Sequence, residues 1–355
     1  MIPNSPGGEG AMAATITDVA KAAGVSKATV SKFLNGTHYV SQETKERIAS
    51  AVSQLGYAPN RVAQGLSLRR SHTIGLVVAN IGNPFYAELI RGAEEVAASR
   101  GYTLLLASTD GEPKREASIV NAMRQRQVDG IAFASVRLAD REVTALAKDG
   151  VKVVLASRHL PDAEVDMVLV DSVKGAKLAV NHLIQHGHKA IAYVGGALSI
   201  AQFQDRLKGW KEALREAGIE PSTEHELSLD RMDVEAGYQA GLQLLKLENP
   251  PTAIFAATDN LAFGIMKACD ELNRAIPDQL ALVGFDAVPF GEVSLSPLTS
   301  VDGSGLIMGQ RALQLLIDRI ERDQRAPSEN RQVRMVLQPT LCIRRSCGCR
   351  PGMEI

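Results

Sequence analysis

The sequence of 355 residues lacks the features that would place it in a membrane or carry it out of the cell. It contains no uninterrupted apolar run of the roughly 18 residues that a membrane-spanning helix needs. Its first residues, MIPNSPGGEGA, have neither the basic start nor the apolar stretch of a signal peptide. We therefore expect a cytoplasmic chain without membrane contact, in which residues 1–13 form a flexible tail.

Motifs for nucleotide binding and nucleophilic catalysis are missing as well. There is no G-x-x-x-x-G-K-[ST] phosphate loop, no G-x-G-x-x-G turn and no nucleophile elbow. The sequence therefore supports no catalytic residue and no cofactor.

Cysteine is scarce, with Cys269, Cys342, Cys347 and Cys349 as its four instances. Reduced thiols are the default in the cytosol. Cys269 stands in an apolar context, which is typical of a buried small hydrophobe. Cys347 and Cys349 form a C-x-C pair, a weak pattern that leaves a metal or redox role open.

Residues 15–35, TITDVAKAAGVSKATVSKFLN, are the most informative stretch that is present. Thr15 suits a helix N-cap, and Asp18 completes a capping box. Apolar residues then recur at the i, i+3, i+4, i+7 spacing of one buried helix face. Gly24 stands where this helix must end in a left-handed conformation, and Ser26 suits the N-cap of a second helix. The pattern predicts a helix-turn-helix.

The second of these helices carries short and basic side chains on its outer face. Such a face suits the major groove of DNA, although a plain helix pair at the start of an enzyme would show similar spacing. A third helix is expected to begin at Ser41 and end at Gly56. The outward residues of the second helix are Lys27, Ala28, Ser31 and Lys32.

Charge is divided unevenly along the chain, whose net charge is −1. Residues 12–71 hold eight Lys and Arg against three Asp and Glu, whereas residues 72–355 hold 31 against 36. A basic N-terminal part on an acidic body predicts contact with phosphates through the N-terminal part alone.

From Thr73 onward, short apolar segments alternate with amphipathic stretches. Strands of four to eight apolar residues separated by helices predict parallel sheets covered on both faces. The number of segments is too large for one small sheet, so we expect an α/β core of two doubly wound subdomains behind an all-α head. The expected strands are 73–79, 102–108, 130–135, 151–157, 167–170, 190–196, 252–258, 280–286 and 298–301.

Taken together, these residues resemble the LacI/GalR family of bacterial transcription regulators from Thr15 to Arg345. The most specific motifs are ITDVAKAAGVSKATVSKFLNG (16–36), LGYAPNRVAQGL (55–66), NPFYAELIRGAEE (83–95), HLIQHGHKAIAYVGG (182–196), RLKGWKEAL (206–214), PTAIFAATDN (251–260) and LALVGFD (280–286).

The resemblance implies a DNA-binding regulator, normally a repressor, that works as a homodimer on a palindromic operator. It implies a helix-turn-helix head over 14–59, a hinge helix over 60–71 and a core of periplasmic-binding-protein type over 72–345. The core's two subdomains are joined by three crossovers and hold a small effector between them, a sugar, sugar acid or related metabolite. The expected boundaries are 72–171 with 302–330 for the first subdomain, 172–301 with 331–345 for the second, and a tail over 346–355.

In the family, the positions matching Lys27, Ala28 and Lys32 reach base edges. Lys32 departs from the arginine often found there, and lysine offers a flexible point charge instead of a bidentate grip on guanine. Leu66 matches the hinge leucine that wedges into the minor groove. The other DNA contacts that the resemblance implies are Thr15, Ser26, Thr29, Ser31, Tyr57 and Asn60.

For the effector, the resemblance points first to Arg206 and Asp286. Asp286 ends an expected strand, at the carboxyl edge where open α/β sheets bind ligands. An arginine facing an aspartate suits the hydroxyls of a polyol, and the arginine could equally pair with the carboxylate of a sugar acid. Phe85 and Tyr86 match aromatic walls. Residues at other strand ends that would line the pocket or hinge are Asn80, Asp110, Ser157, Arg158 and Asp259.

His182 and His186 are spaced i, i+4, which could place two metal ligands on one helix face. The family's H-L-x-x-x-G-H stretch explains them, together with His188, as a helix end and a packed loop, so no metal is expected. The 14 residues after Leu341 contain no leucine, and a dimer is therefore expected rather than a tetramer built through a leucine-rich helix. A cytoplasmic sugar-metabolising enzyme on a doubly wound fold is the alternative.

Overall fold

The computed structural model describes residues 14–35, 40–57, 70–134, 140–157, 160, 164–322 and 332–349. The chain divides into two compact units, Met1–Ser71 and His72–Ile355, here called the head and the core. The expected tail over 1–13 and nearly all of the expected hinge over 60–71 lie outside the described residues.

The head contains the predicted helix-turn-helix. The capping box at its start is present, because Asp18 Oδ2 accepts a hydrogen bond from Thr15 N at 2.9 Å and Thr15 Oγ1 accepts one from Asp18 N at 3.4 Å. Gly24 adopts the left-handed conformation that ends the first helix, with φ 62° and ψ 39°. Ser26 Oγ accepts from Thr29 N at 3.1 Å and so caps the second helix. The helices are α1 (Ile16–Ala23), α2 (Lys27–Asn35) and α3 (Gln42–Gln54).

The three helices share one small apolar core, and a polar contact braces the turn. The Arg47 guanidinium on α3 donates from Nε to the carbonyl of Ala23 at 3.1 Å. Ser41 stands at the predicted start of α3, but its side chain makes no capping hydrogen bond and faces the Thr44 hydroxyl at 2.8 Å instead. The buried core residues are Val19, Ala20, Ala23, Val30, Ile48 and Ala51.

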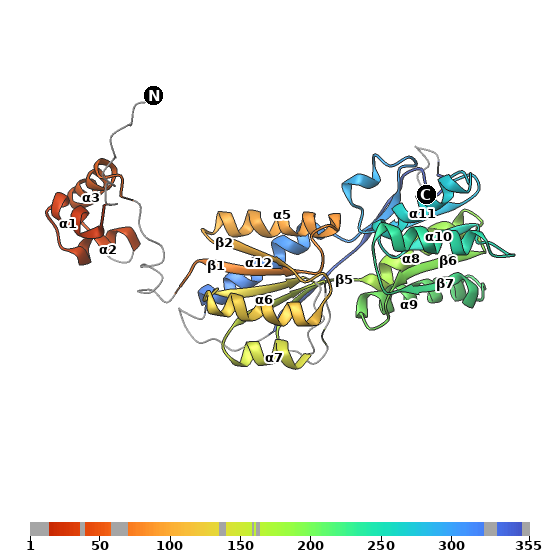
Figure 1. Cartoon of the computed structure of the whole chain (residues 1–355), viewed down its shortest axis with the longest axis horizontal. Coiled ribbons are helices and arrows are strands. Elements are labelled where there is room, and N and C mark those ends of the chain that lie inside the picture. Colours follow the sequence, from red (N-terminus) through yellow and green to blue (C-terminus); the bar gives the residue numbers. More distant parts are fainter. Residues whose placement is uncertain are drawn as a thin grey trace, which may run out of the picture. The chain divides into compact units, whose positions relative to one another are not determined.

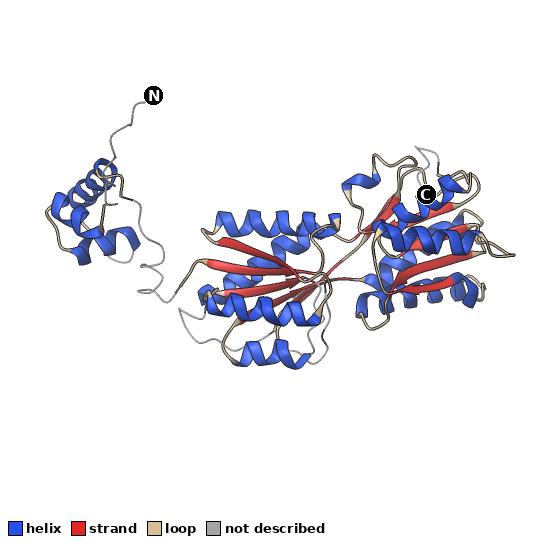
Figure 2. Cartoon of the chain, viewed as in Figure 1, coloured by secondary structure: helices blue, strands red, loops and turns tan. Residues whose placement is uncertain are grey.

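The first subdomain of the core is built on a six-stranded parallel sheet with the strand order β11-β5-β4-β3-β1-β2 (Figures 1 and 2). Helices α5 and α12 pack on one face, and α6 and α7 on the other. The strands are β1 (Thr73–Val78), β2 (Thr103–Ser108), β3 (Gly130–Ala134), β4 (Lys152–Ala156), β5 (Asp166–Val170) and β11 (Arg334–Leu337), and the helices are α5 (Pro84–Ser99), α6 (Pro113–Gln125), α7 (Asp140–Lys148) and α12 (Gly305–Arg322).

The second subdomain repeats this plan with the order β12-β10-β9-β8-β6-β7, in which β12 alone is antiparallel to its neighbour. Helices α8 and α9 cover one face, and α10 and α11 cover the other. The strands are β6 (Ile191–Gly196), β7 (Glu226–Leu229), β8 (Ala253–Ala256), β9 (Ala281–Phe285), β10 (Thr299–Asp302) and β12 (Thr340–Cys342), and the helices are α8 (Ser172–Gln185), α9 (Ala201–Glu216), α10 (Val234–Leu245) and α11 (Asp259–Glu271), with single 3₁₀ turns at Thr223–His225 and Pro289–Gly291.

Within the described residues, the chain passes between the subdomains after β5, after β10 and between β11 and β12. These are the three crossovers that the resemblance implied. Each predicted strand is present. Those that precede residue 171 lie in the sheet of the first subdomain, and those that follow it lie in the sheet of the second. The fully buried runs of β3 and β9 show why continuous apolar segments marked these strands.

Two expected boundaries at the end of the core are wrong. The second subdomain was expected to take residues 331–345, but β11 pairs in parallel with β5 and therefore belongs to the first subdomain. The expected tail over 346–355 begins too early, because Ser346 is buried and its hydroxyl donates to the Leu282 carbonyl at 2.6 Å. Sequence patterning missed β7, β11 and β12 because these edge strands are only half-buried.

No helix in the described part of the chain is long and apolar enough to cross a bilayer.

Candidate functional site

A cavity of about 370 Å³ lies between the two subdomains, at the carboxyl ends of several strands. Parallel sheets bind ligands at this edge, since loops and helix N-termini converge there. Side chains from both subdomains line the cavity. The sequence-predicted residues that the structure brings together there are Asn80, Phe85, Tyr86, Asp110, Ser157, Arg206 and Asp286.

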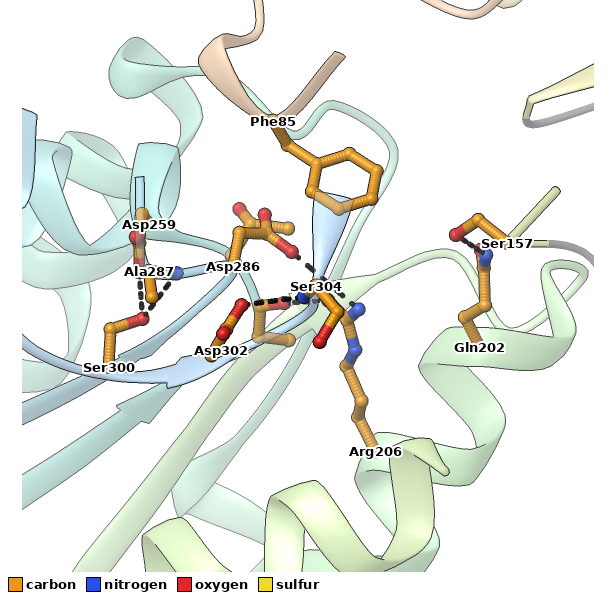
Figure 3. Close-up of polar contacts among 12 residues, drawn as sticks. Phe85, Ser157, Gln202, Arg206, Asp259, Asp286, Ala287, Ser300, Asp302 and Ser304 are labelled. Atoms are coloured by element: carbon orange, nitrogen blue, oxygen red, sulfur yellow. Dashed lines mark hydrogen bonds and ion pairs between the residues drawn. The ribbon is translucent and has the colours of Figure 1, made fainter. Parts of the chain in front are cut away.

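Arg206 and Asp286 form the buried polar centre of this cavity (Figure 3). Arg206 Nη2 lies 3.8 Å from Asp286 Oδ1, and the two side chains are 7% and 6% exposed. The Arg206 guanidinium also donates to the carbonyl of Ala257 and lies 3.5 Å from the centroid of the Phe285 ring. Helix α9 supplies Arg206, and the turn after β9 supplies Asp286, whose φ is 116°.

The hydrogen-bonding capacity of this pair is incompletely used. Among the described residues, the buried Nε atom of Arg206 has no hydrogen-bond partner. Burial raises the pKa of Asp286 well above its ordinary value, although the Arg206 guanidinium acts in the opposite direction. Burial also lowers the pKa of Arg206. A loose ion pair with a spare donor can be completed by a ligand that carries hydroxyl or carboxylate oxygens.

Aromatic side chains form an apolar wall on the side of the first subdomain. Asn83 Oδ1 accepts from Phe85 N at 3.0 Å and so caps α5, which fixes the start of the helix that carries Phe85 and Tyr86. The Phe85 ring lies over the Arg206–Asp286 pair in Figure 3. An added Cβ at Gly305 would stand 3.2 Å from the Phe85 carbonyl oxygen, a tight contact that favours glycine at this position.

A side-chain hydrogen bond spans the cleft between Ser157 and Gln202 (Figure 3). Gln202 Nε2 donates to Ser157 Oγ at 2.5 Å, joining the end of β4 to the first turn of α9. Ser157 has a φ of 66°, a left-handed conformation that is uncommon for serine. The structure therefore shows the two subdomains in direct polar contact at the lining of the cavity.

Several residues that line the cavity are not predicted from the sequence. Asp230, Arg231, Met232 and Asp233 follow β7, and they were overlooked because β7 itself was not predicted. Once a strand is recognised, the polar residues after its carboxyl end are the signal that finds such positions. The remaining missed residues are Ala79, Asn83, Thr109, Gly111, Ile200, Gln202, Phe203 and Thr258.

Asp259 does not line the cavity, contrary to expectation. It is buried behind the cavity, where Oδ1 accepts from Ser300 Oγ at 2.6 Å and Oδ2 accepts from Val288 N at 2.8 Å. These bonds tie the start of α11 to β10 and to the turn after β9. Burial raises the pKa of Asp259 to about 7. Arg158 lies outside the described residues.

Asp259→Asn should make stability less dependent on pH. Because its folded pKa is about 7 and its unfolded pKa is near 4, Asp259 stabilises the fold fully below pH 4 and loses this contribution as pH rises through 7. The measured quantity is the difference in the free energy of unfolding between the wild type and Asp259→Asn. This difference should fall by at most about 4 kcal/mol from pH 4 to pH 8. Urea titrations at several pH values measure it. Asp270→Asn, exposed on the same helix, is the control, and a difference that rises with pH would contradict the assignment.

The head carries a second candidate site on α2. Ser26, Lys27, Ala28 and Lys32 are exposed, whereas Thr29 and Ser31 are half-buried. Thr15 is exposed, and its side chain belongs to the capping box at the start of α1. Tyr57 packs against the head's apolar core. Asn60 and Leu66 lie outside the described residues.

Family models match both the head and the core. Residues 15–60 match the family described as bacterial regulatory proteins, lacI family, and residues 71–341 match the periplasmic binding proteins and sugar binding domain of the LacI family. The chain belongs to the LacI family. Its members are DNA-binding transcriptional regulators and not enzymes, which excludes the alternative of a sugar-metabolising enzyme.

LacI-family regulators resemble the chain along nearly its whole length. The HTH-type transcriptional regulator DegA of Bacillus subtilis (strain 168) is 36% identical over 343 residues, covering 94% of this chain and 98% of DegA. A lac repressor dimer bound to operator and the anti-inducer ONPF matches with a TM-score of 0.81 at 25% identity, over 94% of this chain and 99% of the repressor. A complex of the regulator CelR with cellobiose matches with a TM-score of 0.71 at 31% identity, also over 94% and 99%.

Proposed function

We propose that the chain is a dimeric, cytoplasmic repressor of the LacI family whose operator affinity changes when a polyhydroxylated effector binds in the cavity of the core. One observation carries this proposal: a buried and incompletely satisfied Arg206–Asp286 pair lines a cavity shared by two subdomains, in a chain that begins with a helix-turn-helix. The cytoplasm is the compartment in which such a head meets DNA.

The lining of the cavity favours a sugar, a sugar acid or a related metabolite. Arg206 offers hydrogen-bond donors and Asp286 offers acceptors. Together they suit hydroxyl groups, each of which can both accept and donate a hydrogen bond. Asn80 and Asp110 add polar groups from the first subdomain, and Phe85 and Phe203 offer apolar faces. The CelR complex shows that cellobiose binds one protein of this fold.

Coupling to DNA would follow from the cavity's position between the subdomains. A ligand that contacts both subdomains binds their closed arrangement better than an open one, and it therefore shifts the population toward closure. The Ser157–Gln202 bond is one contact that such a shift would strengthen or break. By linkage, an effector that changes operator affinity must have its own affinity changed by operator to the same degree.

We assign base-edge contact in the major groove to Lys27, Ala28 and Lys32. All three are exposed on α2, and the capped start of this helix is held by Ser26 and Thr29. Ser26, Thr29 and Ser31 then serve phosphate or base-edge hydrogen bonds. Contacts to the DNA backbone and minor groove are proposed for Thr15, Tyr57, Asn60 and Leu66, with residues 60–71 as the hinge.

Selection from a random pool of duplex DNA tests the proposal as a whole. The full-length protein should enrich a palindrome, because two heads related by twofold symmetry read two half-sites. Affinity for that palindrome should fall with salt by about 0.9 log unit per log unit for each phosphate that the protein neutralises. Enrichment of no sequence, with or without a panel of sugars and sugar acids, would refute the proposal.

Lys32→Ala should weaken binding to the selected palindrome by about 10- to 100-fold and relax its preference at one base pair per half-site, because a base-edge contact carries about 1–3 kcal/mol of discrimination. Fluorescence anisotropy against the palindrome and its single-base variants measures both effects. Lys45→Ala, an exposed lysine on α3, serves as the matched control. Equal losses in the two variants would show a general charge effect and remove Lys32 from base recognition.

A further inference from the structure

Three potential metal ligands that lie far apart in the sequence meet in the second subdomain. They are His182 and His186, at the C-terminal end of α8, and Cys349, in the segment after β12. The ligand atoms of all three lie within 4.8 Å of one another. Cys349 Sγ is 2.9 Å from His186 Nε2 and 3.4 Å from His182 Nε2. This cluster is distinct from the cavity that holds Arg206 and Asp286.

Specific contacts bring Cys349 to the end of α8. Ser346 inserts beside the second sheet, where its hydroxyl donates to the Leu282 carbonyl at 2.6 Å and accepts from Thr299 N at 2.8 Å. Gly348 then turns the chain with a φ of 91°, a left-handed value that favours glycine. Cys349 is 7% exposed and belongs to the apolar cluster that also contains Leu183. These contacts therefore fix the position of the Cys349 thiol.

The two histidines approach the thiol from successive turns of one helix. Their spacing is the i, i+4 arrangement that places two imidazoles on the same helix face, and their ring centroids are 4.8 Å apart. The Nε2 atoms of both rings face the thiol, since each lies within 3.4 Å of Cys349 Sγ. Zinc binds the thiolate form of cysteine, so metal binding would displace the proton of the Cys349 thiol.

We propose that His182, His186 and Cys349 form a zinc-binding site that fastens the C-terminal segment to the end of α8. Two nitrogens and one sulfur suit Zn²⁺, which accepts imidazole and thiolate ligands in tetrahedral geometry. Its usual bond lengths place sulfur and nitrogen ligands about 3.5 Å apart, so the two observed sulfur–nitrogen separations need adjustments of less than about 1 Å. His186 is only partly buried, which leaves a side from which water can supply the fourth ligand.

Cys347 is not part of the proposed ligand set. Its sulfur accepts from Thr299 Oγ1 at 3.1 Å and donates to the Arg344 carbonyl at 3.6 Å. It therefore already has hydrogen-bonding partners within the fold. The C-x-C pair then combines a cysteine that packs the segment with a cysteine that binds the metal.

Zinc titration of the full-length protein tests the site. After removal of metal with a chelator under reducing conditions, Zn²⁺ is added in competition with a chromophoric chelator. We expect one Zn²⁺ per chain and a higher melting temperature on loading. Cys349→Ser and His186→Gln should each weaken Zn²⁺ affinity at least about 100-fold, whereas Cys269→Ala and His188→Gln, a buried cysteine and a histidine outside the cluster, should retain it.

Cobalt substitution supplies a readout that loss of folding would not imitate. Co²⁺ in the wild type should show the visible bands of a tetrahedral site and a thiolate-to-cobalt charge-transfer band. Correctly folded Cys349→Ser, checked by circular dichroism, should lose the charge-transfer band. Absence of stoichiometric Zn²⁺ binding would overturn the proposal, as would Zn²⁺ binding that survives in both Cys349→Ser and His186→Gln. Either result would leave operator and effector binding untouched.

Discussion

Arg206→Met should abolish the response of the core to every sugar or sugar acid that stabilises the wild type. The substitution keeps an unbranched side chain of similar reach but removes the guanidinium that lies 3.8 Å from Asp286. Hydrogen bonds from a charged donor contribute about 1.5–3 kcal/mol each, so losing two of them lowers affinity by at least about 100-fold. A thermal-shift screen of the wild type identifies the ligand, and calorimetry on the variant measures the loss.

The control for this variant lies on the same helix. Arg215 is exposed near the end of α9, and Arg215→Met should bind the ligand as the wild type does. Selection of operator by the head should also survive in Arg206→Met, since the head is a separate compact unit. If folded Arg206→Met retained wild-type affinity, the effector would have to bind outside this cavity.

Gly309→Val should destabilise the first subdomain severely. Gly309 on α12 crosses α5 so closely that an added Cβ would stand 2.0 Å from the carbonyl oxygen of Leu89 and 3.0 Å from Ala93 N. Both atoms belong to the backbone, so a side chain cannot rotate away and the helices must separate. We expect a loss of about 3 kcal/mol or more, which lowers the melting temperature by roughly 6–12 °C in a domain of this size.

A glycine at which a Cβ would fit without a clash provides the comparison. At Gly291 an added Cβ would have its nearest neighbour 3.5 Å away, an ordinary van der Waals contact. Gly291→Ala should therefore change the melting temperature little. Scanning calorimetry of both variants separates the effect of the helix crossing from the effect of losing a glycine. Similar melting temperatures in the two variants would mean that α5 and α12 can move apart with little loss of stability.

Local signals in the sequence predicted the head and most of the core. Thr15, Gly24 and Ser26 act within a few residues of their own positions, and the structure shows all three in the predicted capping or turn roles. Buried strands such as β3 and β9 were visible as apolar runs. The edge strand β11 has only four residues, which alternate between exposed and half-buried, and so short a stretch gives patterning too few residues to establish a period.

The candidate sites also contain some residues that local sequence signals locate and others whose position depends on tertiary structure. Asp286 could be placed at the cavity because the carboxyl end of a predicted strand locates it. Asp259 also follows a strand, but its carboxylate turns away from the cavity to accept hydrogen bonds from Ser300 and Val288, and patterning cannot show that choice. The meeting of Cys349 with His182 depends on how the last segment returns to the second sheet, which is a property of tertiary structure.

The three passages of the chain between the subdomains have a consequence for synthesis. Strand β11 lies at one edge of the first sheet and β12 at one edge of the second, and both come from the last stretch of the described chain. A ribosome must therefore synthesise almost the entire polypeptide before either subdomain can add this edge strand to its sheet. Neither subdomain can complete its sheet before the other from one continuous segment. A premature stop codon that removes only this last stretch would therefore leave both sheets without an edge strand.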